Sequence, residues 1–248
     1  AASDVYKRQE IEEEIPDYPV NLFFTKEGYF KKITPISLRM GGEQKLKDGD
    51  VIQQSQESMN NTDLLFFSDK SQVYKTKARD FSDTKASVLG EFIPAKLNMD
   101  EGESAIYMLA TTDYSGYVFF FFENGKVAKV SLKAYETKTN RKKLTGAYSD
   151  KEKLSAIVFV NDEDSEILMR SSSGRALLLH TGAIASKTTR NTQGVAVFKQ
   201  RKGHRLISAE LYHEGMLQTP QRYRTKSIPS SGALPTAEEL EGEQLELK

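Results

Sequence analysis

The sequence of 248 residues contains no cysteine, so it can form neither a disulfide framework nor a thiolate metal site. A chain of this kind suits a reducing compartment. Its only histidines are His180, His204 and His213, which are too scattered to form a close-spaced ligand pair. The composition therefore argues against a metal site.

Long hydrophobic runs are also absent. The longest candidate, 117–122, is far shorter than the roughly 20 apolar residues that a membrane helix requires. A short apolar run of this kind predicts a strand that is buried on both faces. Residues 1–9 show no apolar signal-peptide core and no relation to the rest of the chain, so we interpret them as foreign sequence. We expect no membrane partner.

The formal net charge is zero, but the charges are unevenly distributed. Residues 20–227 contain 32 basic and 24 acidic side chains, whereas residues 1–19 contain 2 and 6, and residues 228–248 contain 1 and 5. A basic body with acidic ends indicates a polyanionic partner, although a well-solvated surface gives the same count.

A pattern of an apolar run, a turn and a second apolar run recurs four times, and lysines accompany the second run in the first three copies. The copies lie at 22–33, 65–75, 118–129 and 167–178. If Gly28, Ser71, Gly125 and Gly174 are equivalent turn residues, the intervals between them are 43, 54 and 49 residues. Such periods predict an array of similar supersecondary units, each of which buries its apolar face against a neighbour.

Each unit contains about four strands, as expected for a propeller blade. Within the third unit, Asn124-Gly125 predicts a hairpin with a type I′ turn. We therefore predict an all-β, propeller-like domain over residues 20–215. Residues 1–19 are expected to form a linker, and the acidic, proline-containing residues 216–248 are expected to form a disordered tail.

The hairpin pattern, the four-strand unit and the loop Arg-Asn-Thr-Gln-Gly-Val at 190–195 resemble the C-terminal domain of the A subunit of bacterial type IIA topoisomerases, shared by DNA gyrase and topoisomerase IV. The similarity extends from residue 17 to about residue 211. This resemblance implies a β-pinwheel, a propeller-like disc whose blades exchange strands and whose basic rim bends DNA. Gyrase domains usually have six blades, so four repeats leave both a closed disc and an open arc possible.

The resemblance includes a degenerate copy of the gyrase signature loop, Gln-Arg-Arg-Gly-Gly-Lys-Gly, at residues 38–44. Arg39, Gly41 and Gly42 match the loop, but Met40 replaces its second arginine and Glu43 replaces its lysine. Two cations that would contact phosphate are lost. We therefore expect a topoisomerase IV-like protein that binds or bends DNA without the full gyrase wrap.

The resemblance also implies what the fragment does not do. In this family the tyrosine that becomes linked to DNA lies in the N-terminal part of the A subunit, so no tyrosine here is expected to be catalytic. No cofactor is expected in this chain, whereas the parent enzyme would use ATP and magnesium. The expected partners are double-stranded DNA, the rest of the A subunit, and the ATPase-bearing B subunit, in the cytoplasm at the nucleoid.

Binding to DNA without sequence preference requires cations that meet phosphates on a suitably curved surface. The predicted cations recur on or just beyond the second hairpin strands and in the connections between blades. In and after the hairpins they are Lys31, Lys32, Lys75, Lys77, Arg79, Lys129, Lys133 and Arg175, and in the connections they are Arg39, Lys45, Lys138, Arg141, Lys142, Lys143, Lys187 and Arg190. Solvation alone explains any one of them, but their recurrence favours a continuous track.

Other interpretations compete with this one. The phenylalanine pairs of the hairpins could stack on bases, but their place inside apolar strands favours the blade core. A propeller with a basic rim could instead bind an acidic protein. A hydrolase on this scaffold would need convergent acids or histidines, which the sequence does not show. We also expect the acidic residues 238–246 to compete with DNA for the basic rim.

Overall fold

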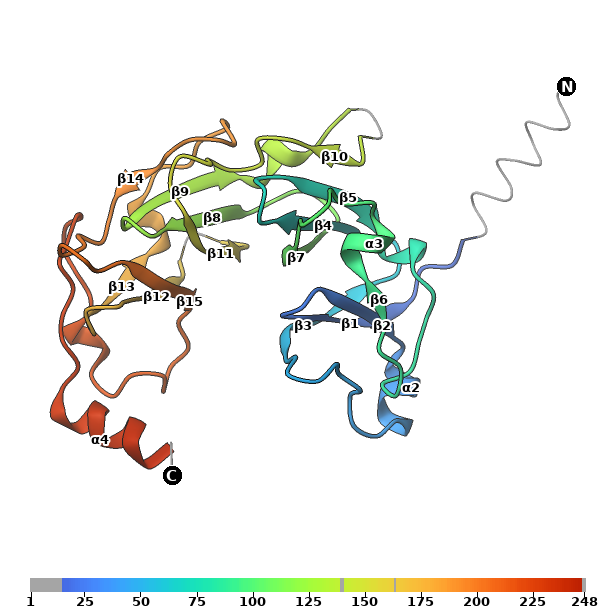
Figure 1. Ribbon diagram of the computed structural model, residues 1–248, viewed down its shortest axis with the longest axis horizontal. Coiled ribbons are helices and arrows are strands. Elements are labelled where there is room, and N and C mark those ends of the chain that lie inside the picture. Colours follow the sequence, from blue (N-terminus) through green and yellow to red (C-terminus); the bar gives the residue numbers. More distant parts are fainter. Residues whose placement is uncertain (1–14, 139–140, 163, 247–248) are drawn as a thin grey trace, which may run out of the picture. The chain divides into compact units, whose positions relative to one another are not determined.

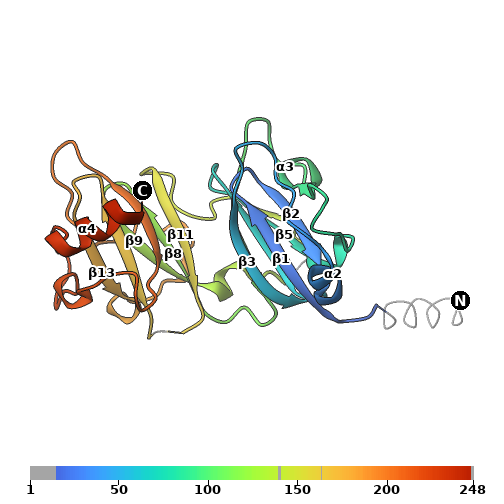
Figure 2. The same ribbon diagram turned by 90° about the horizontal axis from the view of Figure 1, so that it is seen from below.

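The structure is a computed structural model that describes residues 15–138, 141–162 and 164–246. The chain divides into two compact units, with unit 1 ending at Thr112 and unit 2 beginning at Asp113. Each unit contains two of the four predicted repeats, and each is built from small antiparallel sheets (Figures 1 and 2).

Unit 1 contains two sheets. The first has the strand order β3-β1-β2-β6, and the second has the order β5-β4-β7 within this unit. Figure 2 shows β3, β1 and β2 as neighbours. The strands are β1 (Pro19–Thr25), β2 (Tyr29–Ile33), β3 (Ile52–Met59), β4 (Asp63–Ser68), β5 (Val73–Lys77), β6 (Glu91–Phe92) and β7 (Ala105–Thr111), and the helices are α2 (Pro35–Met40), the 3₁₀ helix η1 (Ala78–Asp80) and α3 (Ile93–Lys96).

Unit 2 repeats this plan with sheets of order β11-β8-β9-β14 and β13-β12-β15. Its strands are β8 (Tyr117–Phe122), β9 (Lys126–Ser131), β10 (Lys143–Leu144), β11 (Leu154–Val160), β12 (Glu166–Ser171), β13 (Ala176–His180), β14 (Val195–Ala196) and β15 (Leu206–Leu211). Its helices are η2 (Leu132–Tyr135), η3 (Thr181–Ala183), η4 (Pro220–Arg222) and α4 (Ala237–Glu246). The prediction of an all-β, propeller-like domain with four repeats is confirmed.

The four predicted turn residues all adopt positive φ angles: Gly28 98°, Ser71 55°, Gly125 84° and Gly174 84°. The predicted type I′ turn at Asn124-Gly125 is wrong, because that turn needs positive φ at both residues and Asn124 does not have it. The Gly125 N–H instead donates to the Phe122 carbonyl at 2.9 Å. The hairpin therefore closes through a three-residue loop that ends in a left-handed glycine.

Each unit exchanges an edge strand between its two repeats. Strand β6 belongs by sequence to the second repeat but pairs with β2 of the first, with Tyr29 opposite Phe92. Strand β14 pairs in the same way with β9, with Val195 opposite Val127. The exchange covers an edge that would otherwise expose unpaired backbone groups, and it agrees with the strand exchange that the resemblance implies.

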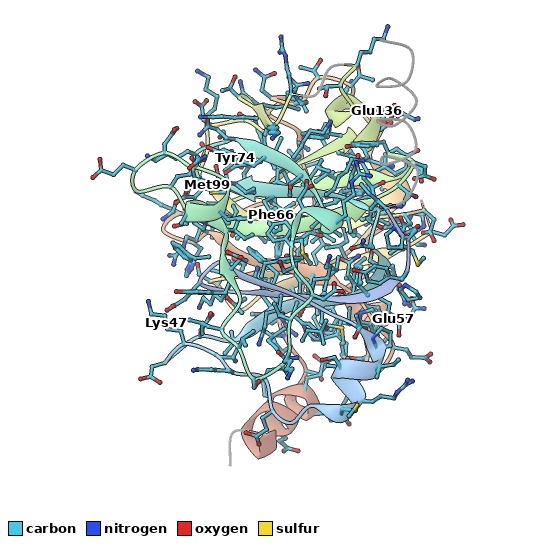
Figure 3. All side chains as sticks on the ribbon, turned by 90° about the vertical axis from the view of Figure 1, so that its right-hand side faces the viewer. Lys47, Glu57, Phe66, Tyr74, Met99 and Glu136 are labelled. Atoms are coloured by element: carbon cyan, nitrogen blue, oxygen red, sulfur yellow. The ribbon has the colours of Figure 1, made fainter. Side chains whose placement is uncertain are left out.

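The phenylalanines of the hairpins form the cores of both units. In unit 1 the ring of Phe66 lies 5.6 Å from that of Phe24 and 5.7 Å from that of Phe30, and Figure 3 shows Phe66 within the strand layer. In unit 2 the side chains of Phe119 and Phe121 are buried against the strands of the fourth repeat. The prediction that these phenylalanines form the core, and do not stack on bases, is supported because buried rings are not available to bases.

The expectation of a disordered tail over 216–248 is wrong for its described part, which folds onto unit 2. Leu217 and Tyr223 pack against Leu168 and Leu178, and Ala233 forms a β-bridge with Ala176. In the described part of the chain, the segment after β15 lies along the edge of β13, where Ala233 and Arg224 form β-bridges with Ala176 and Leu178. The polar composition of this segment predicted disorder. A few apolar side chains and backbone hydrogen bonds are nevertheless sufficient to hold it against unit 2.

Candidate nucleic-acid interface

Lys31 does not lie on the surface. Its side chain, in β2, is 2 % exposed, and its Nζ donates to the carbonyls of Lys45, Ala86 and Val88 at 3.0–3.1 Å. Burial lowers the pKa of this ammonium group. Lys31 therefore holds two loops of unit 1 together, and its prediction as a phosphate contact is wrong.

Lys32, the next residue, is equally buried. Its Nζ donates to Asn60 Oδ1 at 2.6 Å and to the Ala78 carbonyl at 3.0 Å, and it pairs with Asp83 at 3.2 Å. All of these partners belong to unit 1. Lys32 therefore stabilises the fold of unit 1, and its prediction as a phosphate contact is wrong.

Lys129 occupies the equivalent position in unit 2, four residues after the turn glycine. It is 2 % exposed, donates to the Thr181 carbonyl at 3.1 Å, and lies 4.4 Å from the centre of the Tyr117 ring. Ala78 and Thr181 are each the first residue of a 3₁₀ helix that belongs to the next repeat. Lys32 and Lys129 therefore each connect one repeat to the next. The prediction of Lys129 as a phosphate contact is also wrong.

Neighbouring segments explain why these three lysines are buried. In β2 and β9 most residues are buried on both faces of the strand, because the connection from the following repeat passes over the strand. The Thr84 N–H donates to the Lys32 carbonyl, and the Lys187 N–H donates to the Lys129 carbonyl. The sequence shows a lysine in an apolar strand, but only the fold shows that backbone carbonyls surround it.

The other predicted cations of unit 1 differ in exposure. Arg39, Lys45 and Arg79 are exposed, whereas Lys75 and Lys77 are partly buried in β5. The Nζ of Lys77 pairs with Asp63 at 2.8 Å.

The degenerate signature loop lies at the end of α2. The Thr34 side chain caps the helix by accepting a hydrogen bond from the Ser37 N–H, and Pro35 occupies its first turn. Met40 is 84 % exposed and Glu43 is also exposed. An apolar group and an anion thus face solvent at the positions where the related loop has an arginine and a lysine.

Unit 2 brings most of the remaining predicted cations onto its outer connections. Lys133, Lys138, Arg141, Lys142, Lys143 and Lys187 are exposed, whereas Arg175 and Arg190 are partly buried. Arg175 donates to the Gly232 carbonyl at 3.2 Å, and Lys133 pairs with Glu136 at 3.5 Å. Eight predicted residues therefore remain candidates in this unit.

The two connections of unit 2 lie beside each other. The Arg190 guanidinium donates to the Ala134 carbonyl at 2.9 Å, and the Ser131 N–H donates to the Lys187 carbonyl at 2.9 Å. The segment 181–196 thus runs along β9 and η2, so its cations lie next to those that follow η2. Together these segments form a surface with a strong positive charge.

A count of charges separates the units. The connections 132–153 and 181–205 of unit 2 contain 13 basic and 3 acidic residues, whereas the connections 34–51 and 78–104 of unit 1 contain 6 and 9. A DNA backbone carries one negative charge per phosphate, so phosphates are attracted to the first pair of connections and not to the second. The candidate interface is therefore the outer surface of unit 2.

Unit 2 also carries exposed cations that the repeat pattern does not predict: Lys151, Lys153, Lys199, Arg201, Lys202 and Arg205. They lie near the hairpin turns rather than on the second hairpin strands. The basic run 201–205 was the available signal, but the sequence alone does not show which turns lie together.

These features define a class of protein: a propeller-like domain of small antiparallel sheets that exchange edge strands. The family model described as "DNA gyrase C-terminal domain, beta-propeller" matches residues 62–87 and 165–212. The chain is therefore similar to the C-terminal domains of the A subunits of DNA gyrase and topoisomerase IV.

Relatives of both kinds are similar to the chain. The A subunit of DNA gyrase from Borrelia hermsii is 25 % identical over 79 % of the chain, and the A subunit of DNA topoisomerase 4 from Bacillus subtilis is 27 % identical over 69 % of it. The matched regions cover 25 % and 23 % of those two proteins, so the chain corresponds to about a quarter of their length.

Solved structures show the same fold. The crystal structure of the C-terminal domain of DNA topoisomerase IV aligns with a TM-score of 0.68 at 23 % identity, covering 80 % of this chain and 62 % of that one. The E. coli ParC C-terminal domain aligns with a TM-score of 0.64 at 14 % identity, covering 88 % and 94 %. Among the described residues, no helix is long and apolar enough to cross a membrane.

Proposed function

We propose that this chain is a DNA-binding and DNA-bending domain from the A subunit of a type IIA topoisomerase, and that it presents duplex DNA to the ATP-dependent strand-passage enzyme. The observation that supports this most strongly is the positive outer surface of unit 2, formed by the connections 132–153 and 181–205. Exposed lysines and arginines there can neutralise phosphates without reading bases. The similarity to the C-terminal domains of DNA gyrase and topoisomerase IV makes duplex DNA the natural polyanion.

We further propose that the parent enzyme is closer to topoisomerase IV than to gyrase. The support comes from the loop after α2, where the exposed Met40 and Glu43 replace two cations. A DNA segment that passes this loop meets fewer positive charges than the gyrase loop provides. Bending without a full chiral wrap follows from this difference.

The proposed domain has no reaction of its own to perform. We assign magnesium and ATP to other parts of the parent enzyme, as the family resemblance implies. The proposed protein partners are the rest of the A subunit, together with the ATPase-bearing B subunit. As in the bacterial enzymes it resembles, the proposed site of action is the cytoplasm, at the nucleoid.

The test is ligation of nicked circular DNA in the presence of the domain, followed by separation of topoisomers on a gel. We expect binding with little change in linking number, and a larger shift for the variant M40R/E43K, which restores the two cations. A large shift with the unchanged chain would assign it to gyrase. Absence of DNA binding at low salt would contradict the proposal.

A second candidate function is protein docking through unit 1. Ile36 and Met40, on α2, are 63 % and 84 % exposed, and the connections of this unit are not basic overall. A surface of this kind favours a protein partner over DNA. If the chain does not bind duplex DNA, and the variant I36S/M40S loses a protein partner that the unchanged chain binds, this alternative replaces the first.

A further inference from the structure

The hairpin turns of unit 2 gather at one end of the unit. The Glu123 N–H donates to the Lys153 carbonyl, and the Leu206 N–H donates to the Glu123 carbonyl. The N–H groups of Val197 and Phe198 donate to the Gly125 carbonyl. These bonds bring together the turn 123–126 and the segments 149–153 and 197–205.

Seven cations are located at this end, and we call them the turn-end cluster. The cluster consists of Lys126, Lys151, Lys153, Lys199, Arg201, Lys202 and Arg205. Six of them are exposed, and Lys126 is partly buried in a hollow that Lys151, Ser149 and Gln193 also line. The same segments contain only three acidic residues, Glu123, Asp150 and Glu152.

The acidic residues do not neutralise the cluster. Glu123 lies 3.8 Å from the Lys153 ammonium and 3.7 Å from the Arg205 guanidinium, so one carboxylate serves two cations at long distance. The side chains of Lys153 and Arg205 remain 80 % and 60 % exposed. Exposed pairs of this kind contribute about 1 kcal/mol or less, and a phosphate can therefore displace them.

The corresponding end of unit 1 carries the opposite charge. The N–H groups of Lys26, Ile93 and Asp69 donate to the carbonyls of Val51, Gly28 and Ser104, so segments 26–29, 47–51, 69–72 and 93–104 lie together. These segments contain 4 basic and 7 acidic residues, whereas the matching segments of unit 2, 123–126, 149–153, 172–175 and 197–205, contain 8 and 3. The repeated fold places the same turns at each end, but only the end of unit 2 attracts a polyanion.

We propose that the turn-end cluster is a second surface that binds the phosphates of duplex DNA. It is continuous along the chain with the outer connections, because 151–153 follows 138–143 and 199–205 follows 187–190. DNA bound along the connections therefore extends onto this end of unit 2, whereas the equivalent end of unit 1 stays off the DNA. This inference rests on the proposed DNA-binding function.

The test compares two triple variants of the whole chain. K199Q/R201Q/K202Q removes three exposed cations of the cluster, and K26Q/K47Q/K96Q removes three cations from the corresponding end of unit 1. Binding to a fluorescent duplex is measured between 50 and 200 mM salt. Each lost phosphate contact makes the negative slope of log K against log salt less steep by about 0.9. The loss of three contacts lowers the affinity at 0.1 M salt roughly 10²-fold.

We expect the first variant to show that loss and the second to change affinity less than about 3-fold, because it removes no phosphate contact. Wild-type affinity for the first variant, with DNA binding by the unchanged chain intact, would overturn the inference and leave the proposed function standing. Equal losses in both variants would also overturn it, because they indicate a general electrostatic field. No DNA binding by the unchanged chain would remove both proposals.

A second measurement locates the DNA directly. Since the chain has no cysteine, a thiol-reactive photocrosslinker can be attached at a single new position, K202C in the cluster or K47C in unit 1. Figure 3 shows Lys47 projecting outward, so the control position is accessible. We expect DNA crosslinks from position 202 and few from position 47. Equal yields, or more from 47, would overturn the inference.

Discussion

The two units share one architecture but differ in charge. In both, a hairpin turns at a left-handed glycine, a buried lysine bonds the next repeat, and a short strand of the second repeat closes the edge of the first. Yet residues 20–112 contain 12 basic and 13 acidic side chains, whereas residues 113–227 contain 20 and 11. The positive excess of the body comes entirely from unit 2.

This difference shows that fold and binding depend on different atoms. The repeated features lie in the backbone and the core, where a change of size or polarity costs stability. The charges lie on exposed side chains, where substitution usually changes stability by less than about 0.5 kcal/mol. A repeat can therefore lose its attraction for a polyanion without losing its fold.

The largest effect is expected from the turn glycines. A Cβ at Gly125 would lie 1.8 Å from the Phe198 carbonyl oxygen, whereas a Cβ at Gly28 would make only ordinary contacts, the nearest at 3.6 Å with Pro94. We expect Gly125→Ala to cost about 4 kcal/mol or more, because a backbone clash adds to the strained φ, and Gly28→Ala to cost only the strain of about 1–2 kcal/mol. Chemical denaturation of the two variants measures the difference.

Equal costs at the two glycines would contradict this comparison, since both adopt a positive φ and differ only in what surrounds them. Gly49→Ala is a suitable control. Its φ is 81°, and nothing lies within 4 Å of an added Cβ, so it reports the strain alone.

The next effect concerns the buried lysines. Lys32→Met leaves Asn60, Asp83 and the Ala78 carbonyl without their shared donor, which we expect to cost about 3 kcal/mol. Lys129→Met removes the donor to the Thr181 carbonyl but leaves an apolar side chain against two rings. We therefore expect a smaller cost of about 1–3 kcal/mol.

Neither variant should change the affinity of the folded chain for duplex DNA. Denaturation and DNA titration together test this expectation. A selective loss of DNA binding, with unfolding free energy unchanged, would show that these lysines contact phosphate after all.

The smallest effect is a pH dependence of stability, which arises in each unit from one hydrogen-bonded carboxyl, Glu103 in unit 1 and Glu239 in unit 2. Burial opposes ionisation of Glu103, but hydrogen bonds from Ser68, Tyr74 and the Asp100 N–H outweigh it and hold the pKa of the carboxyl below 4.5. In unit 2, bonds from Tyr223 and Thr219 likewise outweigh burial and lower the pKa of Glu239, which fixes the tail. Burial first, and Glu239 second, raise the pKa of Tyr223 to about 12, so its hydroxyl remains a donor at neutral pH.

Because both carboxyls have a lowered pKa in the folded state, their contribution to stability is complete above about pH 4.5 and is lost as the pH falls through the folded value. We expect Glu103→Gln and Glu239→Gln each to cost about 1–2 kcal/mol at pH 7 and to flatten the acid limb of the stability curve. Denaturation between pH 3 and 7 measures this. An acid limb as steep as that of the unchanged chain would contradict the assignment.

Much of the candidate site could be predicted, but not all of it. The exposed cations at 133–143 and 187 followed from composition and position, because short polar connections stay at the surface. Lys31, Lys32 and Lys129 could not be separated from them, since a lysine in an apolar strand looks the same whether its ammonium meets water or three carbonyls. The turn-end cluster was missed because its members come from three segments that are 25 or more residues apart in the sequence.

The sequence by itself determined the number of repeats, the four hairpins and their turn residues, and the aromatic core, because these depend on local apolar patterns and on a backbone conformation that glycine favours. The tertiary structure alone decided which lysines reach solvent and that the tail closes β13. It also decided that the positive charge belongs to unit 2. These outcomes depend on contacts between segments distant in sequence, which no local pattern records.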